Sequence, residues 1–125
     1  QSASGGELSR LMLALKALVA RKTSLPTILF DEIDTGVSGA VAEQVGKMIE
    51  GMGEVMQVIT ITHLPQIGSK GDTHFVVYKE VVGSTTQTMI RKLNPKERIE
   101  EIAKMLSAGK PTEASRRNAK ELLKA

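Results

Sequence analysis

Hydrophobic positions follow a helical period near the start of the chain. Six apolar residues recur at helical spacing, namely Leu8, Leu11, Met12, Leu15, Leu18 and Val19. This pattern predicts an amphipathic helix that starts near Ser4 and ends near Lys22. Ser4 and Glu7 also fit a capping box, in which each side chain satisfies a backbone N–H of the first turn.

The pattern then changes to a continuous apolar run over residues 27–30, which ends in Asp31 and Glu32. Its β-branched and aromatic content, between Pro26 and Gly36, predicts a strand that is buried on both faces of a sheet. Asp34 follows closely. Because a buried, unpaired charge costs several kcal/mol, we expect these carboxylates to lie where the strand leaves the sheet, facing a cation or a polar crevice.

The next stretch predicts a helix and a second strand. The helix follows Ser38, with Val41, Val45, Met48, Ile49 and Met52 on its buried side, and residues 56–62 form the strand. A strand–helix–strand unit favours parallel strands. Parallel strands end at the same sheet edge, so His63 is expected beside Asp31 and Glu32.

The remaining chain predicts the start of a short helix or turn at residues 64–67, and a hairpin of residues 74–81 and 86–93. Two helices follow, one capped by Asn94 and one starting near Thr112. The predicted fold is α/β in one domain over residues 1–125, with parallel strands, an antiparallel hairpin and a helical tail from about residue 95. His74 has no acidic neighbours or motif, and we interpret it as a surface residue.

Composition limits the possible functions. The 125 residues include no cysteine, which excludes disulfides and thiolate chemistry, and no apolar run is long enough to span a bilayer. One Tyr, two Phe and no Trp disfavour a base-stacking platform for single-stranded nucleic acid. Residues 91–125 hold ten Lys or Arg against five Glu. Because the two signs alternate and no base-reading motif accompanies them, we interpret this excess as a solvated helical face in preference to a nucleic-acid patch.

The glycines at the start of the first helix and the carboxylates after the first strand both suit a phosphate ligand with Mg²⁺. Gly5 and Gly6 expose backbone N–H groups at a positive helix end, where a phosphate can approach closely. A strand that ends in Asp-Glu provides one carboxylate for Mg²⁺, usually through water, and another that orients the attacking water. A solvated acidic turn is the structural alternative for the same residues.

Three motifs in series carry a resemblance to a known family. They are residues 2–10 (SASGGELSR), residues 30–39 (FDEIDTGVSG) and residues 61–66 (ITHLPQ). In this order and spacing the chain resembles the C-terminal half of an ATP-binding-cassette ATPase head. The resemblance is to the heads of bacterial recombination and double-strand-break repair proteins related to SMC (structural maintenance of chromosomes) proteins. Such heads have a P-loop NTPase fold and lie in the cytoplasm, associated with the nucleoid.

The resemblance implies a role for each matching residue. Asp31 matches the Walker B aspartate, which acts on Mg²⁺, usually through water. Glu32 matches the catalytic glutamate that positions water, and His63 matches the switch histidine that senses the γ-phosphate of ATP.

Other matching residues act across a dimer of heads. Ser4, Gly5 and Gly6, followed by Glu7, match the signature motif that contacts ATP held by a second head, and Asp34 matches the D-loop at the dimer interface. Ala3 and Glu7 depart from the usual Leu and Gln of this motif, and neither change removes a phosphate-binding group.

A phosphate loop of the form G-x-x-x-x-G-K-S/T does not occur in the sequence. The family carries this loop, followed by a long coiled coil, in an N-terminal half. The chain also starts at Gln1, so we expect a fragment of a longer protein. Its expected partners are that N-terminal half, a second head and, through the full-length protein, DNA. The parent is expected to be an ATPase and the fragment inactive.

Other interpretations remain open. Residues 31–34 (DEID) fit the box of a DExD/H-type helicase core, although that class does not explain the glycine-headed helix. The fragment could instead be a non-catalytic interaction module with a structural acidic edge. A transition-metal site of Asp31, Asp34 and His63 ranks lower, because Mg²⁺ with ATP accounts for the same residues and for the glycines as well.

Overall fold

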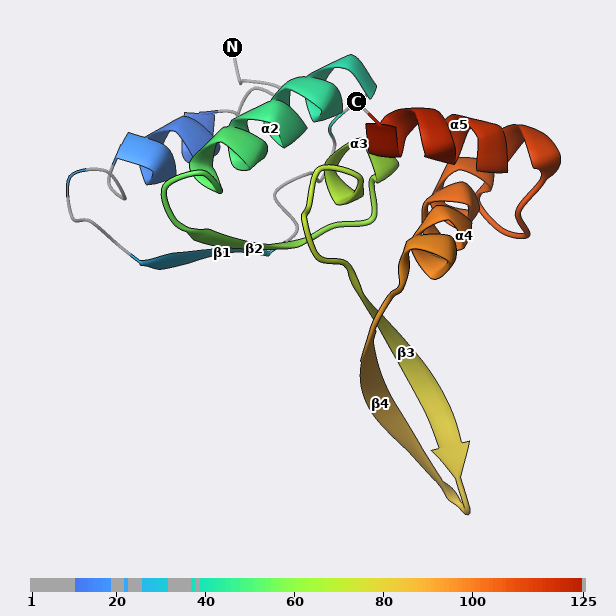
Figure 1. The fold of residues 1–125 in the computed structure, drawn as a ribbon. Coiled ribbons are helices and arrows are strands. Elements are labelled where there is room, and N and C mark those ends of the chain that lie inside the picture. Colours follow the sequence, from blue (N-terminus) through green and yellow to red (C-terminus); the bar gives the residue numbers. More distant parts are fainter. Residues whose placement is uncertain (1–10, 19–21, 23–25, 32–36, 38, 125) are drawn as a thin grey trace, which may run out of the picture. The chain divides into compact units, whose positions relative to one another are not determined.

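The structure is a computed structural model that describes residues 11–18, 22, 26–31, 37 and 39–124. The chain divides into two compact units, Gln1–Lys70 and Gly71–Ala125. The first unit contains the strand–helix–strand motif, and the second contains the hairpin and the last two helices (Figure 1).

In the first unit, α2 (Gly39–Met52) connects β1 (Thr27–Asp31) to β2 (Gln57–Ile61). The two strands are parallel, with Thr27 opposite Gln57 and Asp31 opposite Ile61. A short helix, α3 (Pro65–Gly68), follows β2. The predicted strand–helix–strand unit, its parallel pairing and the short helix are therefore confirmed.

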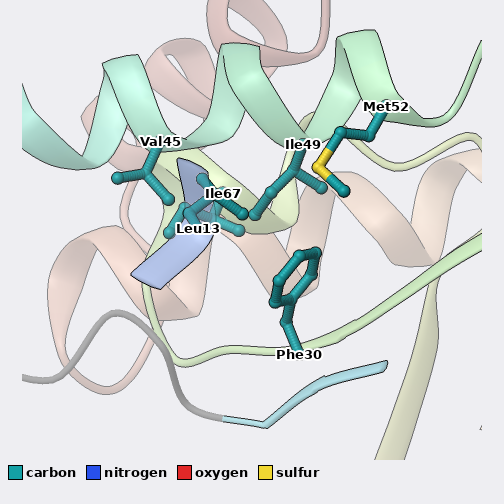
Figure 2. Close-up of a cluster of buried hydrophobic side chains, with 6 residues drawn as sticks. All are labelled: Leu13, Phe30, Val45, Ile49, Met52 and Ile67. Carbon is teal, nitrogen blue, oxygen red and sulfur yellow. The ribbon is translucent and has the colours of Figure 1, made fainter. Parts of the chain in front are cut away.

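A cluster of buried apolar side chains joins these elements to the helix over residues 11–18 (Figure 2). Its members come from four elements: Leu13, Phe30 of β1, Val45, Ile49 and Met52 of α2, and Ile67 of α3. Phe30 is fully buried and points from the strand toward α2 (Figure 2). Burying one such side chain contributes about 1.5 to 3 kcal/mol, so this cluster fixes α2 on one face of the sheet.

In the helix over residues 11–18, the residues that pack against the core are not those of the apolar stripe seen in the sequence. Leu13 is fully buried and Ala17, one turn later, packs against the same cluster. The members of the predicted apolar stripe that the structure describes are all exposed: Leu11, Met12, Leu15 and Leu18. Leu8 and Val19 lie outside the described residues. The predicted helix is confirmed over residues 11–18, but helical spacing identifies an apolar stripe and not what covers it.

Strand β1 is also covered on one face only, which corrects the prediction of burial on both faces. Phe30 is buried, whereas its neighbour Leu29 is 55% exposed. Across the sheet, Ile59 and Ile61 of β2 are 47% and 49% exposed. Successive strand residues alternate between faces, so α2 covers one face and the opposite face presents these apolar side chains to solvent.

Helices α2 and α3 approach each other closely at Gly46. A Cβ atom at this position would lie 2.8 Å from the backbone oxygen of Gln66. Beside this contact, Lys70 Nζ lies 3.0 Å from Glu43 Oε1, and the Lys70 side chain is only 5% exposed. A buried ammonium needs its partner, so this ion pair holds the segment after α3 against α2.

The second unit begins with an antiparallel hairpin of β3 (Phe75–Val82) and β4 (Thr85–Lys92). Each strand reaches one residue closer to the turn than predicted, which leaves a two-residue loop. Gly83 has a φ of 63° at the first loop position, as a type II′ turn requires. At the open end of the hairpin, the Leu93 N–H donates to the His74 carbonyl oxygen.

Two helices complete this unit, α4 (Pro95–Ser107) and α5 (Glu113–Lys124). Asn94 and Glu97 form a reciprocal capping box at the start of α4, as the sequence predicts. Ile102 and Ala103 of α4 pack against Ala119 of α5, and all three side chains are buried. The predicted helical tail is therefore confirmed as a pair of packed helices.

Replacing Gly46 by Ala should destabilise the chain, although Ala normally favours a helix. The added methyl would meet the Gln66 carbonyl oxygen, and overpacking of this kind costs about 1 to 3 kcal/mol. Gly51 lies in the same helix, and no atom of the described residues comes within 4 Å of the place that a methyl group would take there. Gly51→Ala should therefore stabilise the chain by about 0.5 to 1 kcal/mol. Urea unfolding of both variants measures this, and equal effects would contradict the close α2–α3 contact.

Candidate nucleotide site

The carboxyl end of the β1–β2 sheet brings two of the predicted site residues to one edge. Asp31 is the last residue of β1 and lies opposite Ile61, the last residue of β2. His63 follows two residues later. Both Asp31 and His63 are exposed. The structure thus places them at the same end of the sheet, where ligands bind in open α/β folds.

Asp31 lies on the sheet face that α2 does not cover. Phe30 points into the core, so the next side chain along the strand points to the opposite face, which it shares with Leu29. The Lys16 ammonium lies 5.4 Å from the centroid of the Phe30 ring, and such a contact contributes about 0.5 to 1 kcal/mol. Packing of Phe30 therefore fixes the direction of the carboxylate that follows it.

The turn after β2 holds the backbone around His63. The Leu64 N–H donates a hydrogen bond of 3.0 Å to the Thr62 hydroxyl oxygen. Pro65 then starts α3, where its fixed φ suits the first helical turn, and Ile67 is buried in the core. His63 thus follows a strand and precedes an anchored helix, so its position relative to α2 is set by both.

The other predicted site residues lie outside the described residues. These are Ser4, Gly5, Gly6 and Glu7 of the glycine-rich start, with Glu32 and Asp34 after β1. Within the described residues, no three acidic or histidine side chains gather as a metal site would require. Asp31 has no ion-pair partner among the described cations. A free carboxylate at a strand end is the kind of hard oxygen ligand that Mg²⁺ takes, directly or through water.

His74 is a residue whose surroundings differ from the sequence-based interpretation. It is half-buried rather than a plain surface residue, and its Nδ1 atom has no hydrogen-bond partner among the residues that the structure describes. Burial lowers the pKa of His74, and the charge of Arg98 lowers it further, although Glu101 acts in the opposite direction. The sequence carries no local signal for this burial, because His74 precedes β3 and its neighbours, such as the buried Leu93 that donates to its carbonyl oxygen, are distant in the sequence.

Comparison with solved structures identifies the class of fold. The chain superposes on an SMC ATPase described for ATP-driven dimerisation and DNA-stimulated activation, with a TM-score of 0.63 and 22% identity over 85% of this chain and 61% of the other. It also superposes on the Smc head of Pyrococcus yayanosii, with a TM-score of 0.65 and 22% identity over 86% of this chain and 19% of the other. The chain therefore has the fold of part of an SMC head, which agrees with the α/β fold that the sequence predicts.

Sequence comparison then points to a particular protein, RecN. The chain is 49% identical to the DNA repair protein RecN of Rickettsia conorii over 121 residues, which is 97% of this chain and 22% of that protein. It is 43% identical to RecN of Bacillus subtilis over 122 residues, or 98% of this chain and 21% of that protein. The match is to the C-terminal part of RecN, so the resemblance seen in the sequence motifs is confirmed.

The chain spans about a fifth of the length of these RecN proteins. No protein-family model matches it. The likenesses favour an ATPase head over a helicase core, which was the main alternative. In the described part of the chain, no helix is both long and apolar enough to cross a membrane.

Protonation of His74 should reduce the stability of the chain. The pKa of His74 is lowered on folding, so the unfolded chain binds a proton more readily than the folded chain. The contribution of neutral His74 to the stability is therefore fully present above about pH 6.5, the ordinary histidine pKa, and it is lost as the pH falls below that value. Urea midpoints measured between pH 7.5 and 5.5, above the titration of ordinary carboxylates, should decrease for the wild type.

His74→Asn is the matching variant for this prediction, because an amide keeps polar atoms at the site but does not titrate there. Its urea midpoint should change less over the same pH range. His63→Asn serves as the control, since it removes the only other histidine and should keep the decrease. A wild-type midpoint that rises toward pH 5.5 would contradict the assigned direction.

Proposed function

We propose that the chain is the C-terminal half of an ATPase head in a RecN-like protein of DNA double-strand-break repair. The observation that carries the proposal is the common edge of Asp31 and His63, at the carboxyl end of two parallel strands. The likeness to RecN over nearly the whole chain supports it. A location in the bacterial cytoplasm, in association with the nucleoid, follows from this proposal.

At this edge, Asp31 would hold Mg²⁺ through water. The cation supplies charge stabilisation at the phosphates of ATP. Glu32 follows directly in the sequence and would orient or deprotonate the attacking water, and His63 would contact the γ-phosphate. An exposed position suits both Asp31 and His63, because each must reach a ligand that comes from outside the chain.

The rest of the proposed site lies across a dimer of heads. Ser4, Gly5, Gly6 and Glu7 would contact the phosphates of ATP held by the second head, and Asp34 would cross the interface. Two nucleotides would then lie between the heads, and each would use the carboxylates of one head and the glycine-rich start of the other. Backbone N–H groups next to glycine are suited to this contact.

The N-terminal half of the same protein is the proposed partner that supplies the phosphate loop. The uncovered apolar face of the sheet supports this assignment, since Leu29, Ile59 and Ile61 are about half exposed. In a P-loop fold, sheet strands are covered on both faces. We propose that the N-terminal half covers this face and so brings the phosphate loop to the edge with Asp31.

Two inactive variants of the full-length parent should restore activity when they are mixed. Glu32→Gln should keep ATP binding and lower hydrolysis by about 100-fold or more, because it removes the proton acceptor. Ser4→Arg should block the contact across the dimer. In a mixed dimer, one of the two sites combines the unchanged Glu32 of the Ser4→Arg head with the unchanged Ser4 of the Glu32→Gln head. A 1:1 mixture should therefore recover about a quarter of wild-type activity, since half of the dimers each carry one intact site.

The control is the double variant, Ser4→Arg with Glu32→Gln, mixed with wild type. Its mixed dimers contain no intact site, so it should lower the activity of the wild type. ATP turnover by each mixture measures both outcomes. Failure of the two single variants to complement each other would argue against the shared site. Full activity of Glu32→Gln would instead favour a non-catalytic interaction module.

The chain by itself should bind ATP-Mg²⁺ no more tightly than about millimolar, and should hydrolyse none above background. The lysine and amides of a phosphate loop supply most of the hold on the nucleotide, and this sequence lacks them. Calorimetry on the chain tests the prediction. Adding the N-terminal half should restore both properties, whereas micromolar affinity of the chain alone would contradict the assignment.

A further inference from the structure

The second unit has an open pocket of about 600 Å³ between the end of the hairpin and the two helices. Basic side chains line it from three elements: Lys92 of β4, Arg98 of α4, and Lys120 and Lys124 of α5. His74 also lines it, and Asp72 is its only carboxylate among the described residues. The pocket therefore gathers positive charge from distant parts of the sequence around one opening.

The basic residues of this unit fall into two groups. Arg116 Nε donates to Glu100 Oε1 at 2.7 Å, and Arg91 pairs with Glu97. By contrast, Lys92, Lys120 and Lys124 have no carboxylate within 4.0 Å among the described residues. A solvated face with alternating signs accounts for the paired arginines. It does not account for three unpaired lysines around one pocket.

The positive surface continues along α5 beyond the pocket. A second hollow of about 330 Å³ is lined by Glu113, Arg116, Arg117 and Lys120, so the two hollows share Lys120. Arg117, Lys120 and Lys124 lie three and four residues apart, which puts them on one side of the helix. At 1.5 Å per residue they extend over about 10 Å. Phosphates of one DNA strand recur about every 3.4 Å along the axis, so this surface spans several of them.

The chemistry of the surface favours the backbone of a duplex over other anions. A single phosphate would use only part of a basic row of this length. Single-stranded nucleic acid is held largely by stacking on aromatic rings, and no Phe, Tyr or Trp lines either hollow. We propose that the basic surface of Lys92, Arg98, Arg117, Lys120 and Lys124 binds the phosphodiester backbone of a nucleic acid duplex. It shares no residue with the proposed nucleotide site, whose residues all lie in Gln1–Lys70.

The test is fluorescence anisotropy of a labelled 20-base-pair DNA duplex with the 125-residue chain, over a series of salt concentrations without nucleotide. The pocket variant carries Lys92→Gln, Lys120→Gln and Lys124→Gln. The control variant carries Lys79→Gln, Lys104→Gln and Lys110→Gln, three lysines of the same unit that line neither hollow. Both variants lose the same net charge. Circular dichroism melting checks that each variant is folded.

The pocket variant should bind at least 10-fold more weakly than wild type. The slope of log K against log salt should fall by about 2 to 3, since each phosphate contact adds about 0.9. The control variant should stay close to wild type. Equal losses in both variants would show that net charge alone attracts the duplex, and would overturn the proposal. So would absent wild-type binding, tighter binding of the single strand, or displacement of the duplex by millimolar inorganic phosphate at matched ionic strength.

A second measurement follows wild-type His74 by NMR and needs no variant. A bound phosphate favours the imidazolium, so the pKa of His74 should rise when the duplex is added. The charged groups around this imidazole are Asp72, Lys92, Arg98, Glu101, Lys120 and Lys124. An unchanged His74 pKa at saturating duplex would place the DNA elsewhere. Because ATP is absent from both measurements, their outcome is independent of the proposed ATPase.

Discussion

The close approach of α2 to α3 is the constraint on which the first unit depends. Gly46 permits the contact, and the pair of Glu43 with the nearly buried Lys70 holds it. α2 also carries the side chains that bury Phe30, so one helix orients both β1 and the segment after β2. Asp31 is the last residue of β1, and His63 lies between β2 and α3. The parallel pairing of β1 and β2 brings both residues to one edge, and the packing of α2 holds that edge in place. A change at Gly46 would therefore reach both residues although it touches neither.

Among the described residues, the sheet of the first unit buries its apolar side chains on one face only. The sheet buries Phe30 beneath α2 and leaves Leu29, Ile59 and Ile61 about half open on the other face. The helix over residues 11–18 behaves in the same way, with Leu13 inside and its larger apolar stripe outside. A monomer rarely leaves surfaces of this kind without a partner. The proposal that an N-terminal half covers this face rests on this pattern.

Local patterns in the sequence predicted the elements well and their burial less well. The capping box at Asn94, the glycine turn and the parallel pairing all follow from interactions between near neighbours, or from the short helix that joins two strands. Burial of Leu15 or Leu29 depends on what lies opposite, which periodicity does not contain. The common edge of Asp31 and His63 could be predicted because parallel strands end together. The half-buried His74 could not, since its surroundings come from residues as distant as Lys124.

The hairpin has a consequence for the behaviour of the chain in concentrated solution. Its two strands are eight residues long and carry exposed Val77, Val81 and Ile90, so their outer edges could pair with a second copy. Charged side chains interrupt both strands, with Lys79 and Glu80 in β3 and Arg91 and Lys92 in β4. Stacking a further strand would desolvate these charges, which opposes edge-to-edge association. Lys92 would then serve two purposes, as a contact for phosphate in the proposed duplex site and as a charge that opposes aggregation.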